Sequence, residues 1–342
     1  MRGKSDRAPN GYVKKRKKTG MSQRRRKKMA TRMAVFAVLT GVLILSTVKV
    51  TGYVLSFLMA QKASNELREI YYLDVDADYP DAQAIAQRQT EPSVDPAQAA
   101  DAPDKSAGQE ILQTEAPASQ AGELEAIAYP GNPAGRISSR FEKIRRQNQD
   151  IVGWLAIEGL LNEAVVQRDN DYYLRRDYRG YHNLNGAIFL DEACSLQTRP
   201  YTLMLYGHNM KTGAMFGFLR NYEDIGFYKN AAFVTFDTMY EEGRYVIFSV
   251  ATISLDRRDG HYVDVGKLQS NDAAKREEAL GALRKLSSFT SDIDVTAEDQ
   301  FLFLVTCVDN DVERRIVAAR RIREGESLEA LKRRIDESSK RR

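Results

Sequence analysis

Cysteine and histidine are scarce in this chain, which has 2 cysteines and 3 histidines among 342 residues. Two thiols form at most one disulfide, so the chain is not a disulfide-rich scaffold. No Cys-x-x-Cys or His-x-x-His spacing occurs, and we therefore expect no metal and no cofactor. With 9 prolines, 22 glycines and a hydrophobic fraction of 43%, the composition excludes a collagen-like chain and one disordered throughout. The length allows one or two folded domains.

Positive charge is concentrated at the start of the chain. Residues 1–32 contain fourteen Lys and Arg against one acidic residue, whereas residues 74–130 contain twelve Asp and Glu against two basic residues. These balances, with +1 for residues 33–73, already account for the net charge of +4, so residues 131–342 are neutral. A nucleic-acid-binding domain would carry positive charge on a folded face, so this distribution argues against one.

An apolar run follows the basic segment and extends from Met33 to Ala60, with Lys49 as its one charged residue. Its length of about 28 residues is sufficient for a helix to cross a hydrocarbon core of roughly 30 Å. The long Lys49 stem allows the ammonium to reach the interface. The alternative is a cleaved signal peptide, but the run is longer than a typical signal core and no small-x-small site follows it closely. We predict a single-pass anchor in the cell membrane, with the N-terminus cytoplasmic and the rest of the chain extracellular.

The remaining sequence separates into three parts. Residues 61–133 form the first part, and from residue 74 they are rich in Ala, Gln, Asp, Glu and Pro. Because such a composition buries too little apolar area to fold, we predict a largely disordered stalk over 61–133. The pattern becomes globular from Ile137 and predicts a folded domain over 134–323. The last eleven residues carry six Lys and Arg, and we predict a charged tail over 324–342.

Short segments rich in Val, Ile, Phe and Tyr, most of them bounded by turn residues, predict β-strands in the globular region. Helices are predicted over 137–150 and, with leucines along one face, over 271–288. Many short strands with one long helical insertion are typical of a mainly β fold with helices, here a closed β-barrel. The predicted strands are 153–157, 164–167, 186–190, 203–206, 233–237, 245–253, 301–307 and 315–322.

Cys307 and His208 each follow an apolar strand at the point where polar residues begin. Asn209 follows His208, and Asp309 lies two residues after Cys307. A cysteine nucleophile needs partial exposure and a positive neighbour, because the thiolate is the reactive form. Taken alone, a cysteine in this position is more often an inert, buried hydrophobic residue.

Cys194 follows a strand without a histidine or arginine motif beside it, and we expect a structural role for it. A disulfide between Cys194 and Cys307 is an alternative in an oxidising compartment, but it would block the nucleophile. His182 and His261 lie in predicted loops among Tyr and Gly, where surface positions are expected.

The chain contains Tyr206-Gly-His-Asn-Met-Lys around its histidine and Thr306-Cys at its cysteine. These and several other spaced motifs resemble those of class B sortases, which are membrane-anchored cysteine transpeptidases of Gram-positive bacteria. Upstream segments match the class in the same order, and the resemblance covers about residues 137–322. It implies a closed, eight-stranded sortase-type barrel with an N-terminal helix and a long helix before the cysteine strand. The motifs are Asn148-Gln-Asp-Ile-Val-Gly-Trp-Leu, Asp169-Asn-Asp-Tyr-Tyr-Leu, Gly186-Ala-Ile-Phe-Leu-Asp, Tyr206-Gly-His-Asn-Met-Lys-Thr-Gly-Ala-Met-Phe-Gly, Thr306-Cys and Arg315-Ile-Val-Ala-Ala.

The resemblance implies a transpeptidase of the cysteine endopeptidase class that anchors surface proteins to the cell wall. Cys307 would be the nucleophile, His208 the general acid and base, and Arg315 the residue that stabilises the oxyanion or the substrate. The substrate would be a secreted protein with a C-terminal sorting signal, cleaved after Thr through a thioacyl-enzyme. Its acceptor would be an amine of a peptidoglycan precursor or of a pilin.

Three points remain open in the sequence. Arg314 and Arg315 are adjacent, and successive strand side chains face opposite sides, so only one points at the site; the match to the following Ile-Val favours Arg315. Further substrate contacts are expected from Asn209 and from 306–309, that is Thr306, Val308 and Asp309. The alternative functions are a membrane-tethered binding module without catalysis and a plain cysteine protease.

Overall fold

The computed structural model describes residues 23–73, 129–308 and 310–341. The chain divides into two compact units, one up to Ser56 and the other from Phe57 to Arg342. In the first unit the structure describes helix α1 (Gln23–Tyr72) up to Ser56, where nearly every side chain is exposed. By length and composition α1 is a candidate membrane span or signal sequence. The predicted anchor over 33–60 lies within this helix, whereas residues 1–22 and 74–128 lie outside the described residues.

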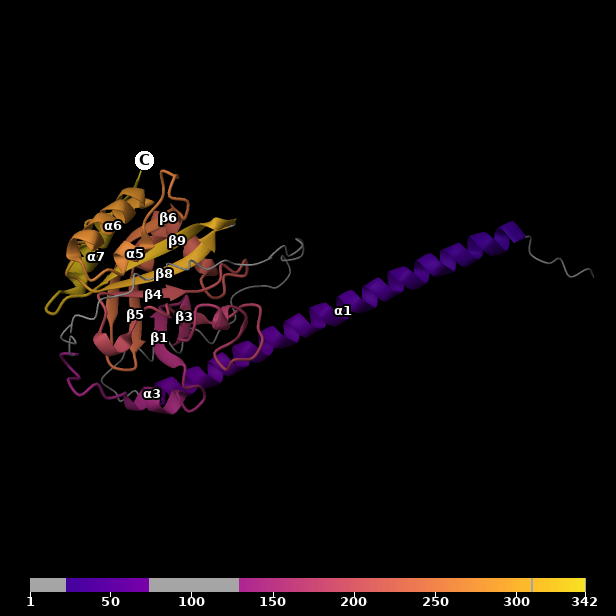
Figure 1. Ribbon diagram of the computed structural model, residues 1–342, viewed down its shortest axis with the longest axis horizontal. Helices are drawn as coiled ribbons and strands as arrows, with labels where there is room; N and C mark the ends of the chain where they lie inside the picture. Colours follow the sequence, from indigo (N-terminus) through magenta and orange to yellow (C-terminus); the bar gives the residue numbers. More distant parts are fainter. Residues whose placement is uncertain (1–22, 74–128, 309, 342) are drawn as a thin grey trace, which may run out of the picture. The chain divides into compact units, whose positions relative to one another are not determined.

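The second unit is built on a closed barrel of eight strands, in the order β1-β2-β3-β4-β8-β9-β6-β5 (Figure 1). This confirms the predicted fold class. Neighbouring strands are antiparallel except for the parallel pairs β2–β3 and β4–β8. The barrel strands are β1 (Ile151–Ile157), β2 (Leu161–Val166), β3 (Ile188–Leu190), β4 (Thr202–Tyr206), β5 (Phe233–Thr238), β6 (Arg244–Ser254), β8 (Phe301–Val308) and β9 (Asn310–Arg321).

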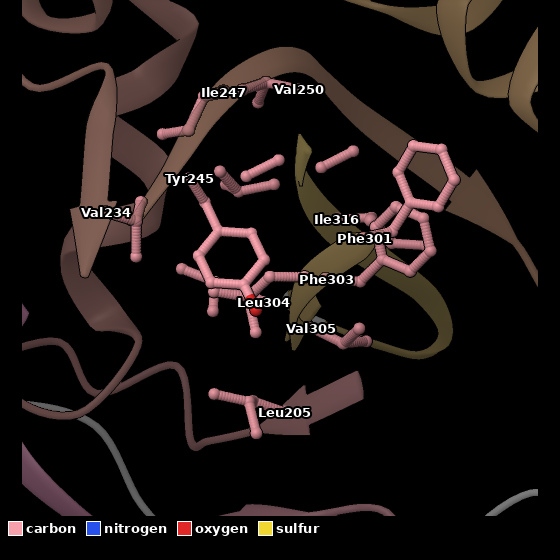
Figure 2. Packing of buried hydrophobic residues seen from close by; sticks show 14 of the residues in the cluster. Leu205, Val234, Tyr245, Ile247, Val250, Phe301, Phe303, Leu304, Val305 and Ile316 are labelled. Carbon is pink, nitrogen blue, oxygen red and sulfur yellow. The ribbon is translucent and has the colours of Figure 1, made fainter. Parts of the chain in front are cut away.

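The strands carry nearly unbroken apolar runs because both faces of the barrel wall are covered in many places. In β8 every residue from Phe301 to Thr306 is buried. Side chains from β4, β5, β6, β8 and β9 come together in the main core (Figure 2). The labelled members of this core are Leu205, Val234, Tyr245, Ile247, Val250, Phe301, Phe303, Leu304, Val305 and Ile316.

A second apolar cluster identifies the outer face of the barrel wall. Phe189 of β3 packs in this cluster with Phe141 and Ile144 of helix α3 (Ser139–Ile144), which lies outside the barrel. Phe189 is paired with Tyr206 of β4, and the two rings lie 5.5 Å apart. Because residues paired across a ladder share a face and successive residues alternate, Tyr206 faces outward and Leu205 faces inward.

The remaining helices cover the barrel or connect its strands. The helix predicted over 271–288 is α6 (Ala273–Leu286), which begins where the Asp272 carboxylate accepts a hydrogen bond from Ala274 N at 2.9 Å and packs against β6 (Figure 1). In contrast, the helix predicted over 137–150 is limited to α3. The other helical elements are α4 (Ile225–Asn230), α5 (Val265–Leu268), α7 (Leu328–Glu337) and the 3-10 helices η2 (Tyr172–Arg175), η3 (Leu196–Thr198) and η4 (Gly217–Glu223).

The prediction of a stalk that begins at residue 61 is wrong for residues 61–72. These residues are the last turns of α1, and Leu67 and Tyr71 are 1% exposed within the second apolar cluster. The Tyr71 ring stacks on Trp154 at 4.2 Å, and its hydroxyl donates a hydrogen bond to Asp237 Oδ2 at 2.7 Å. This end of α1 is therefore part of the folded domain.

The predicted charged tail over 324–342 is also folded in the part that the structure describes. Helix α7 buries Leu331 and Ile335 in the main core, and its charged residues occupy the other positions. The following strand β10 (Ser339–Lys340) pairs with β7 (Phe289–Thr290). Two apolar side chains at i and i+4 share one helix face, and this spacing is sufficient to attach a highly charged helix.

Candidate active site

Strands β4 and β8 bring the predicted histidine and cysteine positions to one edge of the barrel. The two strands are parallel neighbours in which Tyr206 is paired with Val305, and Gly207 N donates to Val305 O at 3.3 Å. His208 follows immediately, and Cys307 lies two residues beyond Val305 in β8. Segments far apart in the sequence therefore end side by side, as expected for parallel strands.

Hydrogen bonds to the His208 carbonyl shape the loop that follows β4. This oxygen accepts from Met210 N and from Phe216 N, each at 3.0 Å. The Phe216 ring packs beneath Gly207, where an added Cβ would lie 2.8 Å from the ring. Asn209 forms a bridge with Met215, and its Oδ1 is buried without a hydrogen-bond partner among the described residues. The loop is thus held close to the strand end.

The His208 side chain is half-buried and its Nε2 lies 2.6 Å from the carbonyl oxygen of Leu174 in η2. A carbonyl oxygen only accepts hydrogen bonds, so Nε2 carries the proton of this contact. Burial lowers the pKa of His208, the Leu174 carbonyl opposes this effect, and the nearby Arg175 charge adds to the lowering. The lowered pKa favours the neutral imidazole, in which a proton on Nε2 leaves the lone pair on Nδ1.

The ladder between β8 and β9 places the two adjacent arginines on opposite faces. Cys307 is paired with Arg314, whereas Thr306 is paired with Arg315. Ile316 is paired with Val305, which is in turn paired with the outward-facing Tyr206. By alternation, position 314 faces outward and position 315 inward.

By this register Arg315 lies on the inward face of the barrel wall, opposite to position 314. The Arg315 side chain is 8% exposed and forms an ion pair with Glu223 of η4. Its Nε has no hydrogen-bond partner among the described residues. Arg314 is the residue paired with Cys307, although the sequence match favoured Arg315.

The predicted substrate contacts at the end of β8 are Thr306, Val308 and Asp309. Thr306 is 2% exposed, on the inward face with Arg315, and its Oγ1 has no partner in the described part of the chain. A side chain buried in this way is not available to a substrate at the surface, which contradicts that prediction. Val308 ends β8, and Asp309 lies outside the described residues.

The other cysteine and the other histidines have the positions expected for residues outside the site. Cys194 is a free thiol, 4% exposed, and burial raises its pKa to about 12. His182 and His261 are exposed, and His261 Nδ1 lies 3.2 Å from an Asp259 carboxylate oxygen. Among the described residues, no group of three His, Cys, Asp or Glu side chains is arranged to hold a metal ion.

The fold and the site together define a barrel protein with a histidine and a cysteine at one parallel strand edge. The chain is 30% identical to sortase B of Staphylococcus aureus over 190 residues, which is 54% of this chain and 75% of that protein. It is also 30% identical to sortase B of Listeria monocytogenes over 191 residues, which is 54% of this chain and 73% of that protein. No family model matches the chain.

A solved structure agrees with these relatives. The crystal structure of sortase B from B. anthracis in complex with AAEK2 is 31% identical and has a TM-score of 0.50, with 56% of this chain and 86% of that chain covered. The chain therefore belongs to the sortase B family, a family of sortase transpeptidases.

Proposed function

We propose that this protein is a membrane-anchored cysteine transpeptidase with Cys307 as its nucleophile. The thiolate attacks the backbone carbonyl carbon of a Thr in a sorting signal and forms a tetrahedral oxyanion. The oxyanion collapses as the peptide C–N bond breaks, which leaves a thioacyl-enzyme and releases the C-terminal fragment as an amine. An acceptor amine then attacks the thioester, so that a new amide forms and the thiol is regenerated.

His208 moves the protons in this scheme. It protonates the departing amine and later removes a proton from the incoming amine. Its lowered pKa is compatible with this role, because it favours the neutral imidazole, which can take up a proton, and makes the imidazolium a stronger acid toward the departing amine. Asn209, next in the chain, is proposed as a substrate contact, because it directly follows His208 and, unlike Thr306, is only half-buried.

Arg314 is proposed as the residue that stabilises the oxyanion, in place of Arg315. The pairing of Cys307 with Arg314 supports this assignment, since an oxyanion donor must lie on the nucleophile's side of the sheet. The Val308 backbone N–H and the Asp309 loop remain proposed as further substrate contacts.

The proposed substrates are secreted proteins with a C-terminal sorting signal, and the proposed acceptor is an amine of a peptidoglycan precursor or of a pilin. The basic N-terminal segment and the apolar part of α1 support a single-pass anchor with its N-terminus in the cytoplasm. With this proposed topology the barrel would lie outside the cell, on the same side of the membrane as the proposed acceptors.

One observation carries the proposal: the parallel ladder between β4 and β8 continues to Gly207, so that His208 and Cys307 follow at a common edge. The test incubates the full chain in detergent with a library of sorting pentapeptides, with and without candidate amines, followed by mass spectrometry. The expected results are a thioester on Cys307 without amine and an amide product with it. Cys307→Ala abolishes both, while Cys194→Ala, the matched control, retains both.

The alternative functions give different results in the same assay. Binding of a peptide that is equal in wild type and Cys307→Ala, with no thioester from any library member, would indicate a non-catalytic binding module. Release of a free carboxylate in the presence of saturating amine would indicate a plain cysteine protease. Either result would overturn the transpeptidase assignment.

The arginine assignment has its own matched pair of variants. Arg314→Ala should lower the transfer rate by about 10²–10³, the usual effect of a lost oxyanion donor. Arg315→Ala removes an ion pair to a half-exposed glutamate, and should lower the unfolding free energy while the rate of the folded enzyme changes by less than about tenfold. The reverse order of effects would restore Arg315 to the site.

A further inference from the structure

The His208 ring contacts the backbone near Leu174 and Gly186, and these contacts determine which ring nitrogen exchanges protons. Nε2 faces the Leu174 carbonyl at 2.6 Å, a short distance for an N–H···O bond. When one ring nitrogen of a neutral histidine donates to a fixed acceptor, the other carries the lone pair. The position of this carbonyl therefore decides the tautomer.

The Leu174 carbonyl is held in place by hydrogen bonds on both sides of it. The Tyr173 carbonyl accepts from Ala187 N at 3.0 Å, and the Arg175 carbonyl accepts from Asn183 N at 2.9 Å. Leu174 itself packs against the second apolar cluster. Since the neighbouring carbonyls are fixed to the 183–187 segment, the Leu174 oxygen has little freedom to turn away from the imidazole.

Gly186 makes this close arrangement possible. It has a φ of +63°, and a Cβ at this position would lie 2.6 Å from Leu174 O, 2.8 Å from Tyr173 O and 3.1 Å from His208 Cδ2. Two of these contacts are shorter than van der Waals separation from backbone oxygens that the hydrogen bonds hold. Any side chain at residue 186 would push the carbonyl away from the ring.

We propose that Gly186 and the Leu174 carbonyl are positioning elements that hold His208 as the Nε2–H tautomer, so that Nδ1 is the atom that exchanges protons. Nδ1 accepts the thiol proton to give thiolate and imidazolium, and it returns a proton to the departing amine. In the imidazolium both nitrogens carry hydrogen, and the Leu174 carbonyl still accepts from Nε2 and stabilises the positive charge. The role of Nδ1 in turnover rests on the proposed function, whereas the tautomer does not.

The first experiment determines the tautomer directly. Full-length protein in detergent micelles is labelled with ¹⁵N-histidine, and long-range ¹H–¹⁵N spectra are recorded above the pKa of His208. His182→Gln and His261→Gln identify the other two histidines. A pure Nε2–H pattern for His208 is expected, and a Nδ1–H pattern or a mixture of tautomers would overturn the proposal. Because no substrate is present, a failure of the transpeptidase assignment leaves this result unaffected.

The second experiment tests the role of Gly186. Gly186→Ala should give mixed tautomers of His208 and a decrease in kcat/KM of about 100-fold, the cost of misplacing a catalytic group by about 1 Å. The matched control is Gly159→Ala, because Gly159 has a φ of +71° and open space where the Cβ would lie. This control carries the same backbone strain and should retain both the tautomer and kcat/KM. A Gly186→Ala protein with a single tautomer and wild-type kcat/KM would refute the role of Gly186; if this variant does not fold, the wild-type spectrum decides.

Discussion

Replacing Tyr71 by alanine should release the end of α1 from the barrel. Tyr71 is 1% exposed, stacks on Trp154 with an angle of 7° between the rings, and donates a hydrogen bond to Asp237. Nearby, the Arg68 guanidinium donates to the Asn162 carbonyl at 2.9 Å and 3.2 Å. Tyr71 thus combines apolar contact, ring stacking and a charge-assisted hydrogen bond at one position.

The expected magnitude follows from these contacts. Truncation of a buried aromatic side chain to alanine costs about 3–5 kcal/mol. One kcal/mol shifts the Tm of a domain of this size by about 2–4 °C, so the Tm should fall by about 6–20 °C. Tyr71→Phe removes only the hydroxyl and should cost about 1.5–3 kcal/mol, the value of a hydrogen bond to a charged group.

The assay uses the fluorescence of Trp154, the one tryptophan of the chain. Its ring is 2% exposed and lies 4.2 Å from the Tyr71 ring, and its Nε1 donates to Asn162 Oδ1 at 2.6 Å. Undocking of α1 exposes the indole to water, so the emission of Tyr71→Ala should shift to longer wavelength before the barrel unfolds.

Tyr53→Ala is the matched control, because Tyr53 lies in the same helix and is 41% exposed. It should leave both the Tm and the Trp154 emission unchanged. Equal effects of the two alanine variants, or a Tyr71→Ala protein with wild-type emission and Tm, would refute the conclusion that α1 is docked.

Three further predictions follow from buried groups. Burial raises the pKa of Asp237 to about 6, so the stabilisation from its protonated form is complete below about pH 4 and is lost as pH rises through 6. In urea titrations the unfolding free energy of Asp237→Asn relative to wild type should therefore increase by roughly 3 kcal/mol from pH 4 to pH 7. A difference that does not change with pH would contradict this. Iodoacetamide at pH 7.5 should modify Cys307 but not Cys194, which is 4% exposed with a pKa raised to about 12; mass spectrometry checks the sites, and rapid labelling of the folded protein at Cys194 would count against this. Leu331→Ala should cost about 2–5 kcal/mol because the side chain is 1% exposed in α7, whereas Leu328→Ala, at an exposed position of the same helix, should cost less than about 1 kcal/mol; equal costs would mean that α7 is not packed.

The sequence alone predicted the barrel because its strands bury both faces. Phe301-Leu-Phe-Leu-Val is apolar at every position, and such runs bounded by turn residues are typical of strands inside a fold. The positions of His208 and Cys307 at strand ends were predictable for the same reason, since apolar strands change to polar loops at the surface. The long helix before the cysteine strand was recognisable from leucines at helical spacing.

The ends of the domain were not predictable from composition. The charged segment over 324–342 resembles a tail because only Leu331 and Ile335 of α7 are buried, and their partners lie far away in the sequence. Likewise, Leu67 and Tyr71 follow directly on an apolar helix, and nothing local indicates that they pack on Trp154. Composition averages over a segment, whereas docking depends on a few side chains and a distant surface.

The sequence by itself determined which residues are available for chemistry: two cysteines, three histidines and, after the cysteine strand, the adjacent Arg314 and Arg315. Only the tertiary structure decided which of them come to the same strand edge. Adjacent strand residues face opposite sides, so a choice between Arg314 and Arg315 depends on the register of β9 against β8, and that register is a contact between strands. The Leu174 carbonyl at His208 is a backbone atom of a distant segment, and no side-chain motif encodes its position.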